Sequence, residues 1–550
     1  MFLRELKVKQ NGKCYTYLKV VESAWVNGRT VQHTLVNLGN VTQWPPERLE
    51  ELVRSLTRLL ESDLVLFSDV DVKECRQLGP YLPLEHLWNE MDLEGIIHKT
   101  LRDRKIDIHV GACTKVLVFQ RLVDPKSKLR TWESLPREAE IPGIDPSALP
   151  LHSYYWALEY LSEAKVPIEK ALHARVRDLF NQDVSLVFYD LTSTYFEGDG
   201  CSMAKKGYSR DHRPDLLQVG IGLLVDQEGI PIGHEVFDGN IKDVTTVVGQ
   251  LRRLKNDFGL TRCVFVGDDG MASEKNLEEV EREGFEYITS LSLRKSLIGE
   301  ELVAQLPSWR TFEQLTPNLR MMPLRKVGRV RFIATYNTER AKSNQRHRKE
   351  RLRQCLCYLK KLDTPPKGRG RKVTPAQRLE TAHNFVRRKE CHRFLHVSQT
   401  PEGGLQWELD RRAVRQEHRM DGLMILKTNS TTLDDKEVST GYRTLWRAED
   451  AFRHLKGPLE LRPIRHWRDP RVLGHIMVCV LAYTMERLLE RKLEKAQMDT
   501  SAARALEELR PIQAVTLEAG DHYVRRRSQI TPRQNALLAA MGVHNVPQIW

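Results

Sequence analysis

Two short apolar runs of the chain each end in an aspartate, and a third acid lies far downstream in an amphipathic segment. The first run, 184–189, ends at Asp190, and the second, 263–267, ends at Asp268. Glu449 lies at the centre of the third segment, 442–456. Because a strand end is a fixed platform, acids there are held in register by the sheet beneath them. Three such carboxylates would form a ligand set for divalent metal ions, which take oxygen ligands and act on phosphate esters.

The composition is that of a globular protein with a large core. With 550 residues and 41% apolar content, the length suggests roughly three or four domains. The first residues show no signal-peptide pattern, and the apolar stretch 472–485 has about 14 residues, fewer than the about 20 that cross a bilayer. The nine cysteines form no ligand-spaced motif. We therefore expect an intracellular, reduced protein with no zinc site and no membrane partner.

The positive charge is concentrated in one region. The net charge is +13, but the segment 340–393 alone holds 18 Lys and Arg against 4 Asp and Glu, so the rest of the chain is nearly neutral. A solvated helix with mixed charges is the alternative interpretation of such a run. One sign dominates here, and the Lys/Arg/Gly stretch 367–372 cannot be explained by pairing within a helix. The segment therefore indicates binding to a polyanion, most simply a nucleic acid backbone, driven by counterion release.

The order of predicted elements identifies a fold. Residues 1–41 alternate in β fashion around two Asn-Gly turns, which predicts a three-stranded meander. Residues 42–180 are mostly helical in pattern. From residue 184, three antiparallel strands are followed by helix, strand, helix and strand, which is the order of a ribonuclease H-like core. The predicted elements of this core are strands at 184–190, 216–225 and 231–237, a helix at 243–256, a strand ending at Asp268, a helix at 273–283 and a strand around Tyr287.

Three sequence blocks resemble a known family. The blocks 189–196, 266–273 and 442–456 resemble the DDE transposases of bacterial insertion sequences. More narrowly, they are similar to the branch marked by a Tyr-Arg-Glu-Lys signature, in which tyrosine lies seven residues before the glutamate and lysine seven after. Tyr442 and Lys456 match both intervals around Glu449, and seven-residue steps place all three side chains on one face of a helix. The resemblance runs nearly end to end.

One position departs from that signature. The signature arginine falls four residues before the glutamate, where this chain has Leu445. Arg447 lies on another side of the predicted helix, whereas Arg453 shares the face of Glu449. Two interpretations of Arg453 stay open, because it either replaces the missing charge or forms an i,i+4 ion pair with Glu449.

The resemblance implies an α/β protein whose ribonuclease H-like catalytic core is interrupted by a basic insertion domain. It implies that Asp190, Asp268 and Glu449 hold two Mg²⁺ ions, with Mn²⁺ as a substitute, and catalyse cleavage and strand transfer in cut-and-paste transposition. The implied partners are double-stranded DNA, as terminal inverted repeats and as target, and a second copy of the chain in a homodimer on paired ends. The implied location is the bacterial cytoplasm, at the nucleoid.

The candidate DNA contacts lie around the third acid and in the basic segment. Trp446 has two interpretations, stacking on an unpaired base at the element end or packing in the core. Lys456 and Arg462 are candidate phosphate contacts, and the basic insertion is expected to follow backbone phosphates. The full set of candidates is Tyr442, Trp446, Arg453, Lys456, Arg462, Lys367, Arg369, Arg371 and Lys372.

Two alternatives to transposition remain open. A metal-dependent nuclease of the same fold would cut without joining, and a non-enzymatic derivative would keep the basic surface but lose the acids. The expected domains are the meander at 1–41, a helical region that reads terminal repeats at 42–180, the catalytic core at 181–292 and 421–492, the basic insertion at 293–420, and a helical tail at 493–550 that could serve dimerisation.

Overall fold

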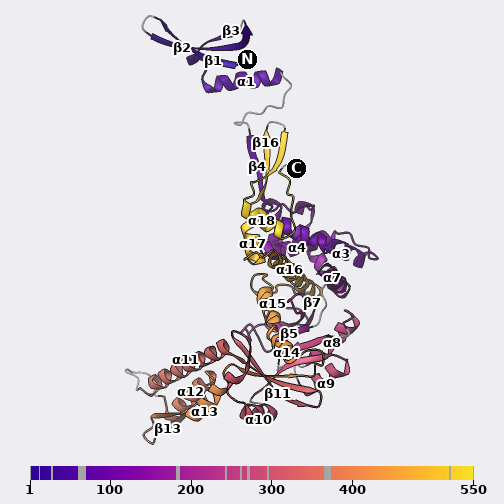
Figure 1. Cartoon of the computed structure of the whole chain (residues 1–550), viewed down its shortest axis with the longest axis vertical. Helices are drawn as coiled ribbons and strands as arrows, with labels where there is room; N and C mark the ends of the chain where they lie inside the picture. Colours follow the sequence, from indigo (N-terminus) through magenta and orange to yellow (C-terminus); the bar gives the residue numbers. More distant parts are fainter. Residues whose placement is uncertain are drawn as a thin grey trace. The chain divides into compact units, whose positions relative to one another are not determined.

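The computed structural model divides into two compact units, each described by itself (Figure 1). The N-terminal unit consists of Met1–Arg76, Gln513–Gln529 and Pro547–Trp550, and the main unit of Gln77–Ile512 and Ile530–Val546. The structure describes residues 2–10, 13–26, 29–59, 70–180, 186–241, 245–260, 263–268, 273–293, 296–364, 373–519 and 522–548.

The N-terminal unit contains two small sheets. Strands β1 (Phe2–Gln10), β2 (Lys13–Val26) and β3 (Arg29–Asn40) form the predicted antiparallel meander, followed by η1 (Val41–Gln43) and α1 (Pro46–Leu59). The second sheet has the order β17-β16-β4, in which β4 (Val70–Gln77) joins β16 (Gln513–Ala519) and β17 (His522–Arg527). The prediction of a helical tail at 493–550 is therefore wrong for part of this segment, because between its helices it returns two strands to a sheet begun near the N-terminus.

Helices form one part of the main unit around a central buried helix, α16 (Asp469–Lys495). Among the described residues, α16 is the one helix that is long and apolar enough to cross a membrane by length and composition, and 89% of its apolar window is buried inside the protein. The other helices of this part are α2 (Tyr81–Glu90), α3 (Leu93–Leu101), α4 (Val110–Val123), α5 (Lys128–Glu138), η3 (Pro146–Ala148), α6 (Leu151–Glu163), α7 (Lys165–Phe180), α17 (Ala502–Leu509) and α18 (Pro532–Ala540).

A nine-stranded mixed sheet forms the other part of the main unit. Its order is β10-β11-β12-β15-β9-β8-β5-β6-β7. Strands β5 (Leu186–Tyr195), β6 (Gln218–Asp226) and β7 (Pro231–Asp238) are antiparallel neighbours, and β8 (Val264–Gly267) and β9 (Glu286–Leu291) follow in parallel on the other side of β5. With α8 (Val247–Asn256) and α9 (Glu274–Arg282) between them, these elements have the predicted order and are consistent with a ribonuclease H-like DDE domain.

The predicted insertion at 293–420 is only partly separate from this sheet. After α10 (Leu297–Gln305) and η5 (Trp309–Thr311), β10 (Glu313–Thr316), β11 (Leu319–Val327) and β12 (Val330–Asn337) continue the sheet through β15 (Leu423–Thr428). What lies outside the sheet is α11 (Thr338–Asp363), α12 (Pro375–Arg388), the hairpin β13 (Leu395–Gln399) and β14 (Leu405–Leu409), and α13 (Arg411–Met420).

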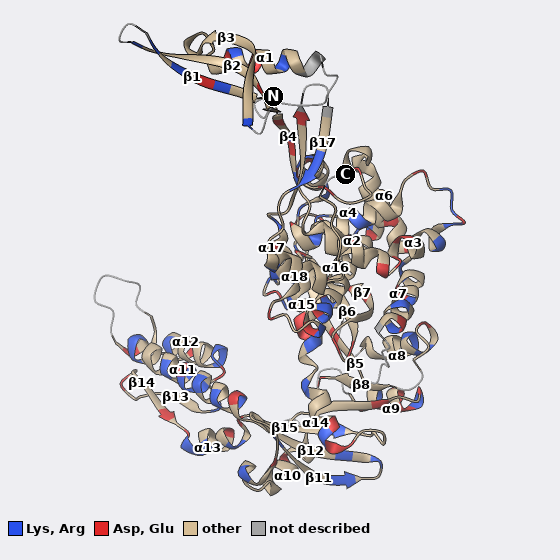
Figure 2. Cartoon of the chain, turned by 45° about the horizontal axis from the view of Figure 1, so that its top comes forward, with Lys and Arg blue, Asp and Glu red and all other residues tan. Residues whose placement is uncertain are grey.

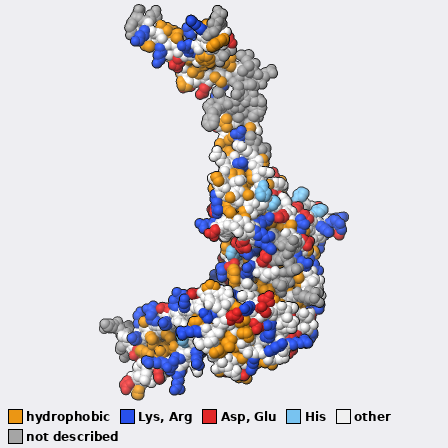
Figure 3. Space-filling model, viewed as in Figure 1, with side chains coloured by type: hydrophobic (Ala, Val, Ile, Leu, Met, Phe, Trp, Pro, Cys, Tyr) orange, Lys and Arg blue, Asp and Glu red, His pale blue; other side chains and the backbone are white. Residues whose placement is uncertain are grey.

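This outer part has its own small core and a basic surface. Cys355 and Leu359 of α11 pack with Ala382 and Val386 of α12, where burial of apolar side chains holds the two helices together. Lys and Arg are spread along both helices, as Figure 2 shows, and gather on the surface over them in Figure 3. Of the 18 Lys and Arg in 340–393, 12 lie on α11 and α12.

Candidate functional site

Asp190 and Asp268 lie side by side on two neighbouring parallel strands. Phe188 of β5 is paired in register with Val266 of β8, so the residue two positions later on each strand is an aspartate. Neighbouring strands are about 4.8 Å apart, so this pairing brings the two acids close together. The sequence predicted the strand before each acid, but β5 continues past Asp190 to Tyr195, so only Asp268 follows the end of its strand. The parallel pairing explains why 78 residues of chain can separate two adjacent acids.

Both acids face the same side of the sheet. Strand alternation places Asp190 on the face of Phe188, and Asp268 on the face of Val266. Phe188 and Val266 belong to the apolar cluster that α15 and α16 cover, whereas Tyr189 belongs to the cluster on the opposite face, against α8 and α9. The third acid must therefore come from an element on the α15 side.

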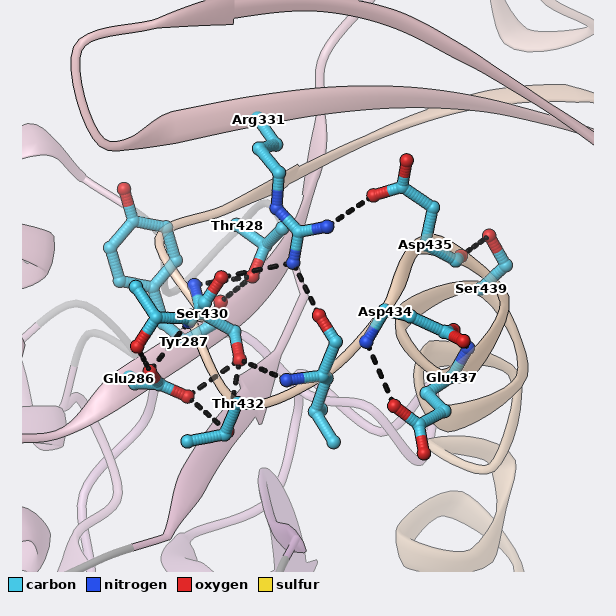
Figure 4. Close-up of polar contacts among 12 residues, drawn as sticks. Glu286, Tyr287, Arg331, Thr428, Ser430, Thr432, Asp434, Asp435, Glu437 and Ser439 are labelled. Carbon is cyan, nitrogen blue, oxygen red and sulfur yellow. Dashed lines mark hydrogen bonds and ion pairs between the residues drawn. The ribbon is translucent and has the colours of Figure 1, made fainter.

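The segment that follows β15 is held by polar contacts to Arg331 of β12 and Glu286 of β9, as Figure 4 shows. After β15, the guanidinium of Arg331 donates to the carbonyls of Ser430 at 2.9 Å and Leu433 at 2.6 Å and forms an ion pair with Asp435. Burial alone would raise the pKa of Glu286, but hydrogen bonds from residues 430–432 hold it below its usual value. These contacts fix the start of the helix that follows.

The segment 442–456 is not one helix. The structure has α14 (Asp435–Arg443), a tight turn at Thr444 and Leu445, and then α15 (Trp446–Lys456). The amides of both turn residues donate to carbonyls only three positions back, and the Thr444 hydroxyl donates to the Gly441 carbonyl at 2.7 Å. The seven-residue spacing from Tyr442 to Glu449 therefore crosses a junction between two helices, and the prediction of one continuous helix over 442–456 is wrong.

The turn lets α15 pack on the strand that carries Asp190. Helix α15 contacts β5 and β6 and buries Ala448, Ala451, Phe452 and Leu455, which repeat at helical spacing. Glu449, in its first turn, is exposed beside this buried stripe. The chain beyond the helix returns to the end of β5, where the Ile464 amide donates to the Tyr195 carbonyl at 3.1 Å. The contacts of α15 with β5, and of the segment after it with Tyr195, thus hold the helix that carries Glu449 against the sheet.

The electrostatics of Asp190 show that the other two acids lie near enough to act on it. The pKa of Asp190 is raised to about 7, mainly by burial and in smaller part by the charges of Asp268 and Glu449. The Leu191 amide, which donates to the Asp190 carboxylate at 2.8 Å, and the charge of Arg210 act in the opposite direction. The carboxyl is therefore a site of uncompensated negative charge.

This donor set fits a hard divalent cation in charge and chemistry, because carboxylate oxygens are its preferred ligands. Within the described ranges, no three His, Cys, Asp or Glu side chains converge closely enough to hold one ion. The three acids are therefore near one another in charge but not gathered around one point in this structure. Mutual repulsion of the kind seen at Asp190 is what a bound cation would relieve.

Lys456 and Arg462, both predicted as phosphate contacts, converge on an acid that the sequence reasoning missed. The Lys456 Nζ lies 2.8 Å from Asp211 Oδ1, and Arg462 pairs with the same oxygen. The Asp211 side chain is 3% exposed, and its Oδ2 has no hydrogen-bond partner in the part of the chain that the structure describes. Burial lowers the pKa of Lys456, although Asp211 opposes this effect.

The other candidates around the third acid are placed as follows. Trp446 is 52% exposed, so the alternative of a core packing role is wrong. Arg453 pairs with Asp450 at 2.7 Å, so the ion pair with Glu449 is absent. Tyr442 packs, half-buried, against the core. The remaining candidates, Lys367, Arg369, Arg371 and Lys372, lie outside the described residues.

Leu445, which stands in place of the signature arginine, is buried in the core cluster. The cation whose charge acts on Asp190 is instead Arg210, from the loop between β5 and β6. Its sequence signal is a basic stretch around one aromatic residue, 205–213, directly after the first acid-bearing strand.

A pocket at the sheet lies away from these acids. Its volume is about 580 Å³, and Glu286, Lys326, Arg329 and Arg331 are among its lining residues. The strand pairing from β12 across β15, β9 and β8 to β5 places Arg331 level with Phe188. Arg329 precedes Arg331 by two residues, on the side away from Asp190. The pocket therefore opens at the sheet end opposite to Asp190 and is not part of the acid site.

Two family models match the chain. The transposase DDE domain model covers residues 182–485, which is more than half of the chain and includes all three acids. The model of the N-terminal domain of IS1634 family transposases covers residues 3–64. Neither match supports the narrower Tyr-Arg-Glu-Lys branch. No curated protein matches the chain.

Proposed function

Because the chain belongs to the IS1634 family of insertion-sequence DDE transposases, we propose that Asp190, Asp268 and Glu449 are its catalytic acids. The observation that carries this proposal is the register of β5 and β8, which puts the first two acids at equivalent positions on adjacent parallel strands. Glu449 completes the set from α15, which packs on the same strand.

As a transposase of this class, the protein is an enzyme that binds DNA and uses divalent metal ions. We assign the binding of two Mg²⁺ ions to the three acids, with Mn²⁺ as a substitute. Bound Mg²⁺ supplies Lewis-acid activation of the attacking oxygen and stabilises the leaving oxygen in phosphoryl transfer.

The chain's own residues prepare this chemistry. Asp190 must lose its proton before it can act as a ligand, and its raised pKa makes this step sensitive to pH near neutrality. Arg210, beside it, offers a positive charge to the DNA backbone. Lys456 and Arg462 together carry one more positive charge than Asp211 neutralises, so the cluster suits a phosphate next to the acids.

We also propose how the protein assembles on its DNA. Two element ends must be joined to one target, so we assign a homodimer on paired ends. The N-terminal unit and the helices before β5 would read the terminal inverted repeats, and α11 and α12 would follow backbone phosphates of element or target DNA. The bacterial nucleoid is the place where such a substrate lies.

The experiment is DNA cleavage by the full chain with Mg²⁺, on duplexes that carry the inverted repeats flanking the gene. Asp190→Asn, Asp268→Asn and Glu449→Gln should each lower the cleavage rate at least about a thousandfold. Asp450→Asn is the matched control, because Asp450 neighbours Glu449 but pairs with Arg453. Wild-type activity in one of the three variants would remove that residue from the proposal.

Strand transfer needs a second assay. Pre-cleaved ends with free 3′-hydroxyls, mixed with plasmid target, should be joined by the wild-type protein and not by the acid variants. Cleavage without joining would instead assign the protein to the nucleases.

A further inference from the structure

The loop between β5 and β6, residues 196–217, is held firmly to the sheet. Lys205 exchanges two backbone hydrogen bonds with Gln218, of 3.0 and 3.2 Å, and the Arg210 amide donates to the Ser193 hydroxyl at 3.0 Å. Gly207 lies so close to the next turn that a Cβ there would come within 2.2 Å of the Gly239 carbonyl oxygen. The loop backbone is therefore fixed by contacts on both sides of residue 208.

The same loop is joined to the helix of the third acid. Asp211 forms its buried ion pairs with Lys456, the last residue of α15, and with Arg462 just beyond it. Seven residues separate Lys456 from Glu449, so the anchor lies two helical turns from that acid. Whatever side chain residue 208 carries is thus positioned relative to the acid site.

Tyr208 projects from this anchored loop into solvent. Its side chain is 83% exposed, among the most exposed large apolar residues that the structure describes. The Arg210 guanidinium lies 5.8 Å from the centre of its ring, and the charge of the same arginine acts on Asp190. Lys206, two residues before the tyrosine, is also exposed. A solvent-facing ring on an anchored loop, beside the Arg210 cation, has no packing role within the chain.

We propose that Tyr208 stacks on an unpaired nucleobase of the DNA at the acid site, and that Arg210 contacts the adjacent phosphate. This inference rests on the proposed function, because it takes the DNA to be the element end that the three acids cleave. Every base has a π-face, so stacking on tyrosine binds an unpaired base without selecting its identity. Arginine beside the ring adds a charge-assisted contact to the backbone. Asp211 is the positioning residue that holds both groups.

The test uses duplexes that end in the terminal repeat and carry 2-aminopurine at the nucleotides flanking the cleavage position. Ca²⁺ replaces Mg²⁺ to hold the full chain on uncleaved DNA. Wild-type binding should change the 2-aminopurine fluorescence. Tyr208→Ala should abolish this change and weaken binding about tenfold. Tyr208→Phe keeps the ring and should retain both. Leu297→Ala, at a side chain that is 86% exposed on α10, is the matched control and should behave as wild type.

Salt dependence separates the two roles. Arg210→Met should lower the slope of log Kd against log salt by about 1, because one phosphate contact is lost, whereas Tyr208→Ala should leave the slope unchanged. Equal melting temperatures for all variants would show that folding is intact.

Two results would overturn the stacking inference. One is a full fluorescence change with wild-type affinity in Tyr208→Ala, and the other is a Tyr208→Ala defect in self-association of the protein alone. If the wild-type protein cleaves element ends but either result is obtained, only the stacking inference fails. If the wild-type protein cleaves no element end, the proposed function fails first.

Discussion

Lys456 and Asp211 form a buried ion pair, although 245 residues separate them in the sequence. Their side chains are 11% and 3% exposed, and 2.8 Å separates the Lys456 Nζ from the Asp211 Oδ1. The pair joins the loop after the first acid-bearing strand to the helix that carries the third acid. It therefore couples the placement of two catalytic candidates.

Removal of the acid from this pair should be costly. Asp211→Ala leaves the Lys456 ammonium buried without a counter-charge, so we expect the free energy of unfolding to fall by about 3–5 kcal/mol. Urea denaturation measures this loss. Asp215→Ala is the control from the same loop, because its pair with Arg213 is exposed to solvent and should contribute much less to stability. Equal effects of the two substitutions would contradict the buried pair.

Metal affinity should depend on pH through Asp190. In the metal-free protein its pKa is about 7, and the cation binds the ionised carboxylate. The affinity for Mn²⁺ should therefore fall by up to about tenfold per pH unit below pH 7 and level off above it. Isothermal titration at pH 6 and pH 8, in two buffers of different ionisation enthalpy, measures the affinity and the proton released. Equal affinity at both values, with no proton release, would show that Asp190 is not a ligand.

A buried lysine gives a pH dependence of stability. The Lys128 Nζ lies 2.8 Å from the His475 Nδ1, and burial, with the charge of Arg121, holds the pKa of Lys128 well below its usual value. Between the folded and unfolded pKa values the unfolded chain binds one more proton, so the contribution of Lys128 to stability rises with pH, by up to about 1.4 kcal/mol per unit.

The comparison that isolates this effect is Lys128→Met, in which nothing titrates at that position. The difference in unfolding free energy, wild type minus variant, should grow between pH 7 and pH 9 in urea titrations. A difference that stays constant over this range would mean that Lys128 is charged in the folded protein.

The basic helices of the insertion should contribute affinity without sequence preference. Arg346 and Lys349 of α11 and Arg387 of α12 are exposed, so replacing all three with Gln should lower the salt slope of DNA binding by about 3. Fluorescence anisotropy with repeat and random duplexes should show the same loss for both. Arg282→Gln, on α9, is the control for one exposed cation elsewhere. A loss confined to repeat DNA would assign these helices to base recognition instead.

The sequence predicted those parts of the site that local patterns determine. The apolar runs before Asp190 and Asp268 are true strands, because alternation and flanking turns are local signals. The order of elements from β5 to β9 was also predicted. The break at Thr444 was missed, because the bond from its hydroxyl to the Gly441 carbonyl competes with a helix that the seven-residue spacing favours.

Contacts between distant segments could not be predicted in this way. Because β12 pairs with β15, part of the expected insertion belongs to the main sheet. The sequence of neither strand indicates which strand it pairs with. The ion pair of Asp211 with Lys456 is equally non-local, so an acid in a basic loop was passed over. Arg210 was missed for the same reason, because its effect on Asp190 depends on how that loop folds back.

The sheet β17-β16-β4 has a consequence for synthesis of the protein. Strand β4 leaves the ribosome early, but β16 and β17 begin only at Gln513 and His522. During translation of the more than four hundred intervening residues, β4 has neither of these neighbours, and its edge can be completed only near the end of translation. A nascent or prematurely terminated chain therefore lacks this sheet, so the N-terminal unit acquires its final structure only after all three acids have been synthesised.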